Sequence, residues 1–161
     1  MQPKLLKIAF LSFLVLSLFS CKKDKDDEIP ANEITDAQGI NIKLNWSLTD
    51  GSSALAGADI DFYVYKGVGT AKEFIPVVEA DNSTAFEDEN FLNALADGDY
   101  TLEIDYFEIL KNGKFNLVFK AMGSDRAYSL NDNSFTTANH EQFFDFAKIS
   151  KTGTKYTFTK L

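Results

Sequence analysis

Two pairs of acidic residues have a spacing that could support acid–base chemistry. Asp59 and Asp61 are two positions apart, and so are Glu103 and Asp105. Residues at i and i+2 lie on one face of a β-strand, and glycoside hydrolysis needs two carboxyl groups that flank a cleft. An acidic protein also places such residues on its solvent face, and we expect both pairs there. The alternative to this solvent-exposed role is a small hydrolase that uses one of these carboxylate pairs.

Other catalytic motifs are missing from the sequence. His140 is the only histidine and Cys21 the only cysteine, whereas zinc sites need several such ligands. The segment Gly123-Ser124-Asp125 lacks the framing glycines of the nucleophile elbow G-x-S-x-G. We therefore predict a protein that is not an enzyme, with His140 as an ordinary loop residue.

Calcium is the one cofactor for which the acidic residues are candidate ligands. Asp59, Asp61 and Asp99 fall near the ends of predicted strands, and Ca²⁺ takes roughly six to eight oxygen ligands. None of these residues fits the D-x-[DN]-x-[DN]-G spacing of an EF-hand loop. We expect no other cofactor, and at most a structural calcium ion at these acids.

Cys21 follows a short basic and apolar leader. Two lysines precede an apolar run over residues 8–19, which is shorter than the roughly 20 residues of a membrane-spanning helix. The run ends Leu18-Phe19-Ser20-Cys21, which resembles the lipobox of bacterial lipoproteins. The resemblance implies that residues 1–20 are a signal peptide and that Cys21, the first mature residue, carries a diacylglycerol. A buried free cysteine or a membrane-spanning anchor is the alternative.

The residues after Cys21 are strongly charged. The run Lys22-Lys23-Asp24-Lys25-Asp26-Asp27-Glu28 is similar to the stretch after the lipid-bearing cysteine in lipoproteins of Bacteroidetes-type bacteria. That resemblance implies export to the outer face of the outer membrane, and a solvated spacer is the alternative. Residues 21–38 are polar, contain Pro30 and show no period, so we expect a flexible, lipidated tether.

The net charge limits the classes of partner that the chain can bind. It is −8 for the full chain, and removal of residues 1–20 with their two lysines leaves −10. A chain this acidic does not attract phosphate backbones, so we predict no nucleic-acid partner. We expect contact with the membrane only through the lipid, because an anionic bilayer surface repels the rest of the chain.

Beyond the tether, apolar and polar residues alternate as they do in half-buried strands. The alternation is clearest in residues 40–48, 58–65 and 100–106. A last hairpin is predicted from residues 142–149 and 155–160, which are joined by a turn containing Gly153.

Two further segments carry local signals. Asn112-Gly113 stands between apolar runs at residues 107–110 and 115–119. Asn-Gly tolerates the positive φ angles of a type I′ turn, so these runs are predicted to form a hairpin. Residues 87–96 alone suggest a helix, because Phe91, Leu92 and Leu95 have helical spacing.

This series of short strands predicts an all-β protein. We expect a single antiparallel β-sandwich, Ig-like or jelly-roll-like, over residues 39–161 with one short helix. Its core should hold residues from successive strands, namely Trp46, Phe62, Ile104 and Leu117.

Three strand sequences resemble a known kind of sandwich. Residues 59–65 (DIDFYVY), 98–104 (GDYTLEI) and 115–119 (FNLVF) are similar to strands of bacterial pre-peptidase C-terminal-type domains. The insert over residues 67–97 and the C-terminal hairpin depart from that pattern. The resemblance implies a non-catalytic accessory module of an exported protein and does not supply a ligand.

Aromatic residues give the last functional indication. Rings on an outward face could stack on sugars or on a partner protein, and the candidates are Tyr63, Tyr65, Phe107 and Tyr128. We expect a second sheet or the predicted helix to cover these rings, and an outward row is the alternative. The sequence as a whole predicts a surface-exposed lipoprotein of the outer membrane whose sandwich binds a glycan or protein partner, or serves as a structural accessory.

Overall fold

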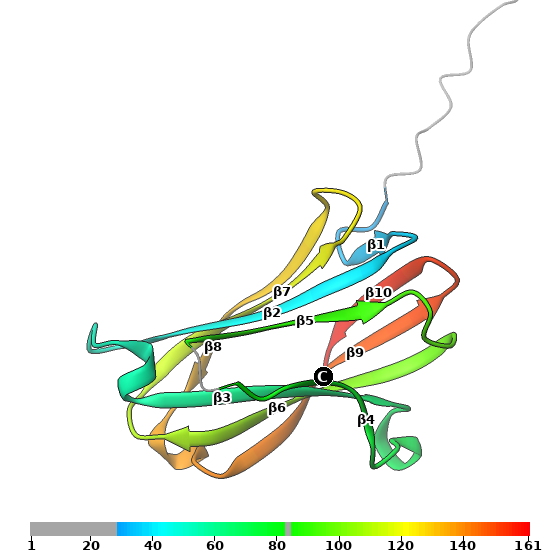
Figure 1. The fold of residues 1–161 in the computed structure, drawn as a ribbon. Helices are drawn as coiled ribbons and strands as arrows, with labels where there is room; N and C mark the ends of the chain where they lie inside the picture. The colour runs from blue at the N-terminus through cyan, green and yellow to red at the C-terminus, as the bar shows by residue number, and fades with distance from the viewer. Residues whose placement is uncertain (1–28, 83–84) are drawn as a thin grey trace, which may run out of the picture.

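The computed structural model describes residues 29–82 and 85–161, so Cys21, the signal peptide 1–20 and the charged run 22–28 lie outside the described residues. The described chain forms two antiparallel sheets that pack against each other (Figure 1). The strands are β1 (Glu33–Thr35), β2 (Gly39–Leu48), β3 (Ala58–Lys66), β4 (Pro76–Ala80), β5 (Phe86–Leu92), β6 (Gly98–Ile109), β7 (Gly113–Ala121), β8 (Ala127–Phe135), β9 (Gln142–Thr152) and β10 (Lys155–Lys160).

The two sheets differ in size. The order in the six-stranded sheet is β1-β10-β9-β6-β3-β4, and in the four-stranded sheet it is β5-β2-β7-β8. Figure 1 shows β2 and β5 in one layer and β3 and β6 in the other. This arrangement confirms the predicted all-β sandwich. In the described part of the chain, the helical segments are three-residue 3-10 turns, and none has the length or apolar character that a membrane span requires.

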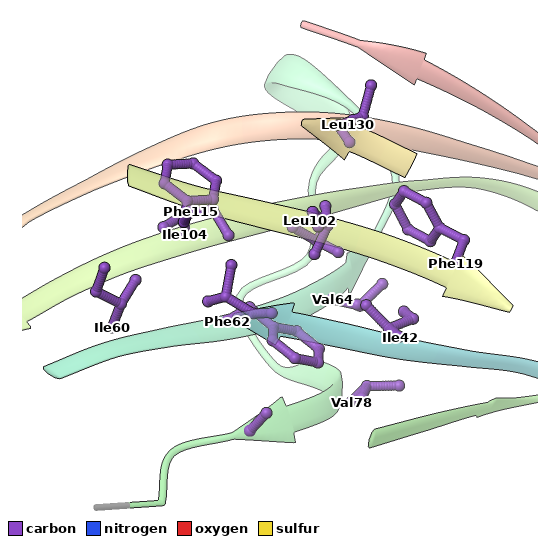
Figure 2. Close-up of a cluster of buried hydrophobic side chains, with 14 of the residues drawn as sticks. Ile42, Ile60, Phe62, Val64, Val78, Leu102, Ile104, Phe115, Phe119 and Leu130 are labelled. Carbon is purple, nitrogen blue, oxygen red and sulfur yellow. The ribbon is translucent and has the colours of Figure 1, made fainter. Parts of the chain in front are cut away.

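The core lies between the sheets, where apolar side chains from both meet (Figure 2). Ile60, Phe62 and Val64 point inward from β3 because they alternate with polar residues along the strand. Figure 2 shows Leu102 and Ile104 of β6 facing Phe115 and Phe119 of β7 across the interior. The four residues expected to share one core, Trp46, Phe62, Ile104 and Leu117, are all buried in it.

The prediction of a helix over residues 87–96 is wrong. Residues Phe86–Leu92 form strand β5, which pairs antiparallel with β2, so that Ile40 lies opposite Phe91. Glu87 and Phe91 are buried while Asp88 and Leu92 are exposed, which is the period of two of a strand. Backbone pairing with β2 therefore overrides the helical spacing of the apolar residues.

The prediction of a hairpin at Asn112-Gly113 is also wrong. Strands β6 and β7 lie in different sheets, so this connection crosses the sandwich. A glycine is needed at position 113 because neighbouring groups approach the backbone closely there, and not because of a turn. A Cβ atom would lie 2.2 Å from the Phe135 ring and 2.5 Å from the Ser47 carbonyl oxygen. The backbone carbonyl of Asn112 accepts a hydrogen bond from the Thr49 N–H at 3.0 Å, which fixes the connection to the end of β2.

The C-terminal hairpin is confirmed. Strands β9 and β10 pair directly, with Thr152 opposite Lys155, and Gly153 has a φ of 56° in the turn between them. A left-handed φ of this kind favours glycine over residues with a side chain.

The sandwich begins earlier than expected, which corrects the tether boundary at residue 38. Ile34 of β1 is fully buried, and β1 pairs with β10. The buried carboxylate of Asp36 accepts backbone N–H bonds from Gln38 at 2.7 Å, Gly39 at 3.3 Å and Gly123 at 2.7 Å. Burial would raise the pKa of Asp36, but these hydrogen bonds hold it below its ordinary value. A three-residue strand is too short to show a period in the sequence.

Candidate functional site

The outer face of the six-stranded sheet carries acids and aromatic rings. On β3, the inward residues Ile60, Phe62 and Val64 alternate with outward residues, of which Asp61, Tyr63 and Tyr65 follow one another. Tyr63 and Tyr65, two of the four rings that we expected a second sheet or the helix to cover, lie instead on this outward face, half-buried and 6.4 Å apart between ring centroids.

Strand register brings residues distant in the sequence into two neighbouring rows on this face. One row runs from Asp61 of β3 to Asp105 of β6 and Phe143 of β9. The next runs from Tyr63 to Glu103 and Asp145 on the same three strands. Directly opposed residues have Cβ atoms about 5 Å apart. The structure thus brings Asp61, Glu103 and Asp105 together, and bulges in the β3–β6 and β6–β9 pairings help set this register.

A groove of about 530 Å³ lies over these rows. Its walls come from β3, β6 and β9 and from the segment between β3 and β4, and we call it the outer groove. It is lined by Tyr63, Tyr65, Lys72, Glu73, Phe74, Glu103, Asp105 and Phe143. Phe74 is 99% exposed and Phe143 is 68% exposed, so two apolar rings face solvent at its margin.

Lys72 places a positive charge between two acids in one half of the groove. Its Nζ lies 2.6 Å from Oε2 of Glu103 and 2.6 Å from Oδ1 of Asp145. The same nitrogen lies 5.0 Å from the centroid of the Tyr65 ring, within the range of a cation–π contact. Burial would lower the pKa of Lys72, but the hydrogen bonds to Asp145 and Glu103 outweigh it and raise the pKa. The ammonium is therefore held in its charged form.

The neighbouring row has no such cation: its acids are Asp105, which lines the groove, and Asp61, which lies opposite Asp105 but is not one of the lining residues. Asp61 is only 6% exposed, and neither it nor Asp105 has a hydrogen bond or ion pair with another residue in the described ranges. Burial, and then the charges of Asp59, Glu87, Asp105 and Asp81, raise the pKa of Asp61 to about 7. Burial and the Glu103 charge also raise the pKa of Asp105. Asp61, Glu103 and Asp105 lie on the outer face of their sheet as expected, but Asp61 and Glu103 are buried there.

Asp59 lies beyond the bulge, opposite Glu108. Its pKa is raised by burial and by the Glu108 charge. Its Oδ1 is buried and has no hydrogen-bond partner among the described residues. Asp59 is close enough to Asp61 to affect its pKa, but it does not line the outer groove.

The three acids considered for calcium do not form one site. Asp99 lies six residues from Asp105 along β6, a rise of about 20 Å in a strand. Its carboxylate accepts a hydrogen bond from Ser150 Oγ at 2.6 Å and lies 3.6 Å from Nζ of Lys148. Within residues 29–82 and 85–161, no group of three or more His, Cys, Asp or Glu side chains is arranged to hold a metal ion.

The remaining sequence candidates lie outside the groove. Tyr128 packs on the core and stacks on Phe158, with ring centroids 5.6 Å apart, so it is covered as expected. Phe107 is exposed, so the expectation that it is covered is wrong, and it does not line the groove. Nδ1 of His140 accepts a hydrogen bond from the backbone N–H of Ile109 at 3.1 Å, a structural contact at the start of β9.

The sequence did not identify Lys72, Phe74 and Phe143 as groove residues. Lys72 and Phe74 lie in the segment between β3 and β4, which has no period. Phe143 and Phe144 are adjacent, so alternation alone cannot say which of them faces outward. Comparison of the chain with protein-family models, with curated proteins and with solved structures gives no match, so the resemblances to lipoproteins and to accessory sandwich domains rest on the sequence motifs alone.

Proposed function

We propose that the protein is a lipid-anchored component of the outer membrane, displayed on the cell surface, whose β-sandwich is a non-catalytic module that binds a glycan in the outer groove. The observation that carries the binding role is the combination of exposed rings and carboxylate acceptors in one groove. A sugar ring has an apolar face that stacks on an aromatic side chain, and hydroxyl groups that donate hydrogen bonds to carboxylates.

The size of the groove favours a short glycan over a protein partner. Its volume of about 530 Å³ falls within the roughly 300–1,000 Å³ of small-ligand sites. A stable protein interface buries about 800 Å² on each partner, which needs a broader apolar surface. We therefore take an oligosaccharide of a few residues as the ligand.

Binding can be tested with the full-length protein, extracted in detergent, on an array of oligosaccharides and then by calorimetry with the best ligand. Tyr65→Ala should weaken binding about tenfold, because it removes a stacking ring from the groove. Phe107→Ala is the matched control, since it removes an exposed ring away from the groove, and it should bind like the wild type. Equal affinity of all three proteins, or no bound oligosaccharide, would contradict the proposal.

A hydrolase is the second candidate, because Asp61 and Asp105 are direct neighbours and the pKa of Asp61 is raised to about 7. A general acid works best with a pKa near the working pH. The two acids, however, project from neighbouring strands of one sheet face, so a sugar would lie over them instead of between them. Release of reducing ends from the bound oligosaccharide, lost in Asp105→Asn, would establish the hydrolase and overturn the non-catalytic role.

The anchor is tested by the acceptor thiol. If Cys21 carries the lipid, the protein should stay in the membrane fraction through salt washes and be released by detergent, because several acyl chains act together. Cys21→Ser should leave an unprocessed precursor. Recovery of the protein outside the membrane fraction, with the Cys21 thiol free, would contradict the anchor.

Surface display is tested by the charged run that follows Cys21. Neutralising Asp24, Asp26, Asp27 and Glu28 should reduce protease shaving of intact cells. Equal shaving of both proteins would mean that the charges act only as a spacer.

A further inference from the structure

The two rows beneath the outer groove contain the same kind of acid pair but differ in charge balance. Glu103 lies directly opposite Asp145, and Asp61 lies directly opposite Asp105. Like charges directly opposite each other on neighbouring strands destabilise a sheet. Both pairs therefore need a cation when they are ionised, and only the first obtains one from the described residues.

Lys72 shows what this surface binds. Its ammonium group contacts Glu103 and Asp145 at 2.6 Å each and lies over the Tyr65 ring. An ammonium has three N–H donors, so it can serve two carboxylates and leave one donor for water. Two acids with an adjacent ring thus form a site for a primary amine within this protein.

The Asp61–Asp105 pair repeats that arrangement one row along. Asp105 lines the groove, with Phe143 opposite it on β9 and Tyr63 lining the same groove. Asp61 does not itself line the groove, but it lies directly opposite Asp105 and faces the same side of the sheet, since the residues before and after it, Ile60 and Phe62, both point into the core. It is 6% exposed and has no hydrogen-bond or ion-pair partner in the described part of the chain. The fully buried side-chain oxygen without a partner in the described ranges is Oδ1 of Asp59, so the Asp61 carboxylate is largely buried but still open to a cation.

We infer that the glycan bound in the outer groove carries protonated amines, as a deacetylated amino sugar does, and that one amine pairs with Asp61 and Asp105 beside the Tyr63 and Phe143 rings. The inference rests on the proposed glycan-binding function. An amine suits this site better than Ca²⁺, because Ca²⁺ takes roughly six to eight oxygens whereas an ammonium needs two or three acceptors. The flanking rings add a cation–π attraction to an organic cation.

The test compares two tetrasaccharides that differ only in the amine. Calorimetry on the full-length protein in detergent would use a glucosamine tetrasaccharide and an N-acetylglucosamine tetrasaccharide at about pH 7, where an amine is still largely protonated and Asp61, with its pKa of about 7, is partly ionised. The wild type should bind the amine form about tenfold more tightly, the effect of one charge-assisted pairing. The preference should shrink as salt is added, because part of the site is open to solvent.

Two variants connect the preference to the acid pair. Asp105→Asn keeps the shape of the side chain and should reduce the preference to less than about twofold, and Asp61→Asn should do the same if Asp105→Asn fails to fold. Asp125→Asn is the matched control, because it removes the same charge from an exposed turn. It should retain the tenfold preference.

The possible failures are distinguishable. Equal binding of both tetrasaccharides, or an unchanged preference in both acid variants, would overturn the amine inference and leave glycan binding intact. Binding of a lysine-rich peptide that depends on Asp105, with neither tetrasaccharide bound, would overturn it in favour of a protein partner. Failure of every oligosaccharide on the array would instead remove the proposed function itself.

Discussion

The two faces of the six-stranded sheet use the same strands for opposite purposes. The inner face of β3 and β6 presents Phe62 and Ile104, which are fully buried against the second sheet. The outer face presents acids and half-buried rings, with Phe74 standing 99% exposed at its margin. The inner face holds apolar side chains whose burial stabilises the fold. The outer face retains opposed acids that weaken it, a cost that would be expected if this face is the proposed binding surface.

The largest effect should come from the inner face. Phe62→Ala should lower the free energy of unfolding by about 3–5 kcal/mol, because it removes a fully buried ring and leaves a cavity. Denaturant unfolding of the purified protein measures this loss, with the exposed Phe107→Ala as control. A loss below about 1 kcal/mol would show that Phe62 is outside the core and would contradict the strand assignment of β3.

A middle-sized effect is expected where the outer face supplies its own cation. Lys72→Met should cost on the order of 2 kcal/mol, since it leaves the buried Glu103 carboxylate opposite Asp145 without a counter-charge. Lys72→Arg should restore most of the stability. The control is Lys66→Met, which removes an exposed lysine whose Nζ lies 3.9 Å from Oε1 of Glu73. Equal unfolding midpoints for Lys72→Met and Lys66→Met would mean that the bridge contributes nothing.

The opposed acids should make the outer face sensitive to pH. The pKa of Asp61 is about 7 in the folded protein and near 3.8 in an ordinary environment, so the folded state holds the proton more tightly. Stability from this group is therefore present below about pH 4 and is lost as the pH rises to about 7. Allowing for solvent screening, full ionisation should cost on the order of 1–2 kcal/mol.

Asp61→Asn isolates that contribution, because asparagine does not ionise. The variant should match the wild type in unfolding free energy near pH 4 and exceed it by about 1–2 kcal/mol at pH 8. The comparison must be a difference between the two proteins, since Asp59 and Asp105 have raised pKa values of their own and Asp36 has a lowered one. A constant difference across this range would contradict the raised pKa of Asp61.

The inner face could be predicted from the sequence and much of the outer face could not. Alternation places Phe62 and Ile104 in the core because one buried face leaves a period of two in each strand. The same alternation places Asp61, Tyr63 and Tyr65 on the other face. It cannot place Asp105 beside Asp61 or Phe143 beside Asp105, because these neighbours depend on strand order and on bulges that shift the register.

The wrong predictions share a physical cause. The helical spacing in residues 87–96 and the Asn112-Gly113 turn signal are local preferences, whereas strand pairing is set by contacts far along the chain. Strand β5 gains its backbone hydrogen bonds from β2, and Gly113 is required by the approach of Phe135 and Ser47. Tertiary contacts of this kind override weak local propensities.

The smallest effect on stability should come from the phenylalanine that contrasts most with Phe62. Phe74 is 99% exposed and lies outside the core, so Phe74→Ala should change the free energy of unfolding by no more than about 0.5 kcal/mol. If the ring forms a wall of the outer groove, the same variant should weaken oligosaccharide binding several-fold. Denaturant unfolding and calorimetry on one preparation separate the two quantities. A stability loss comparable to that of Phe62→Ala would place Phe74 in the core, and unchanged binding would remove this ring from the site. Loss of binding without loss of stability is expected only if the outer face serves a ligand, because an exposed ring contributes little to the fold itself.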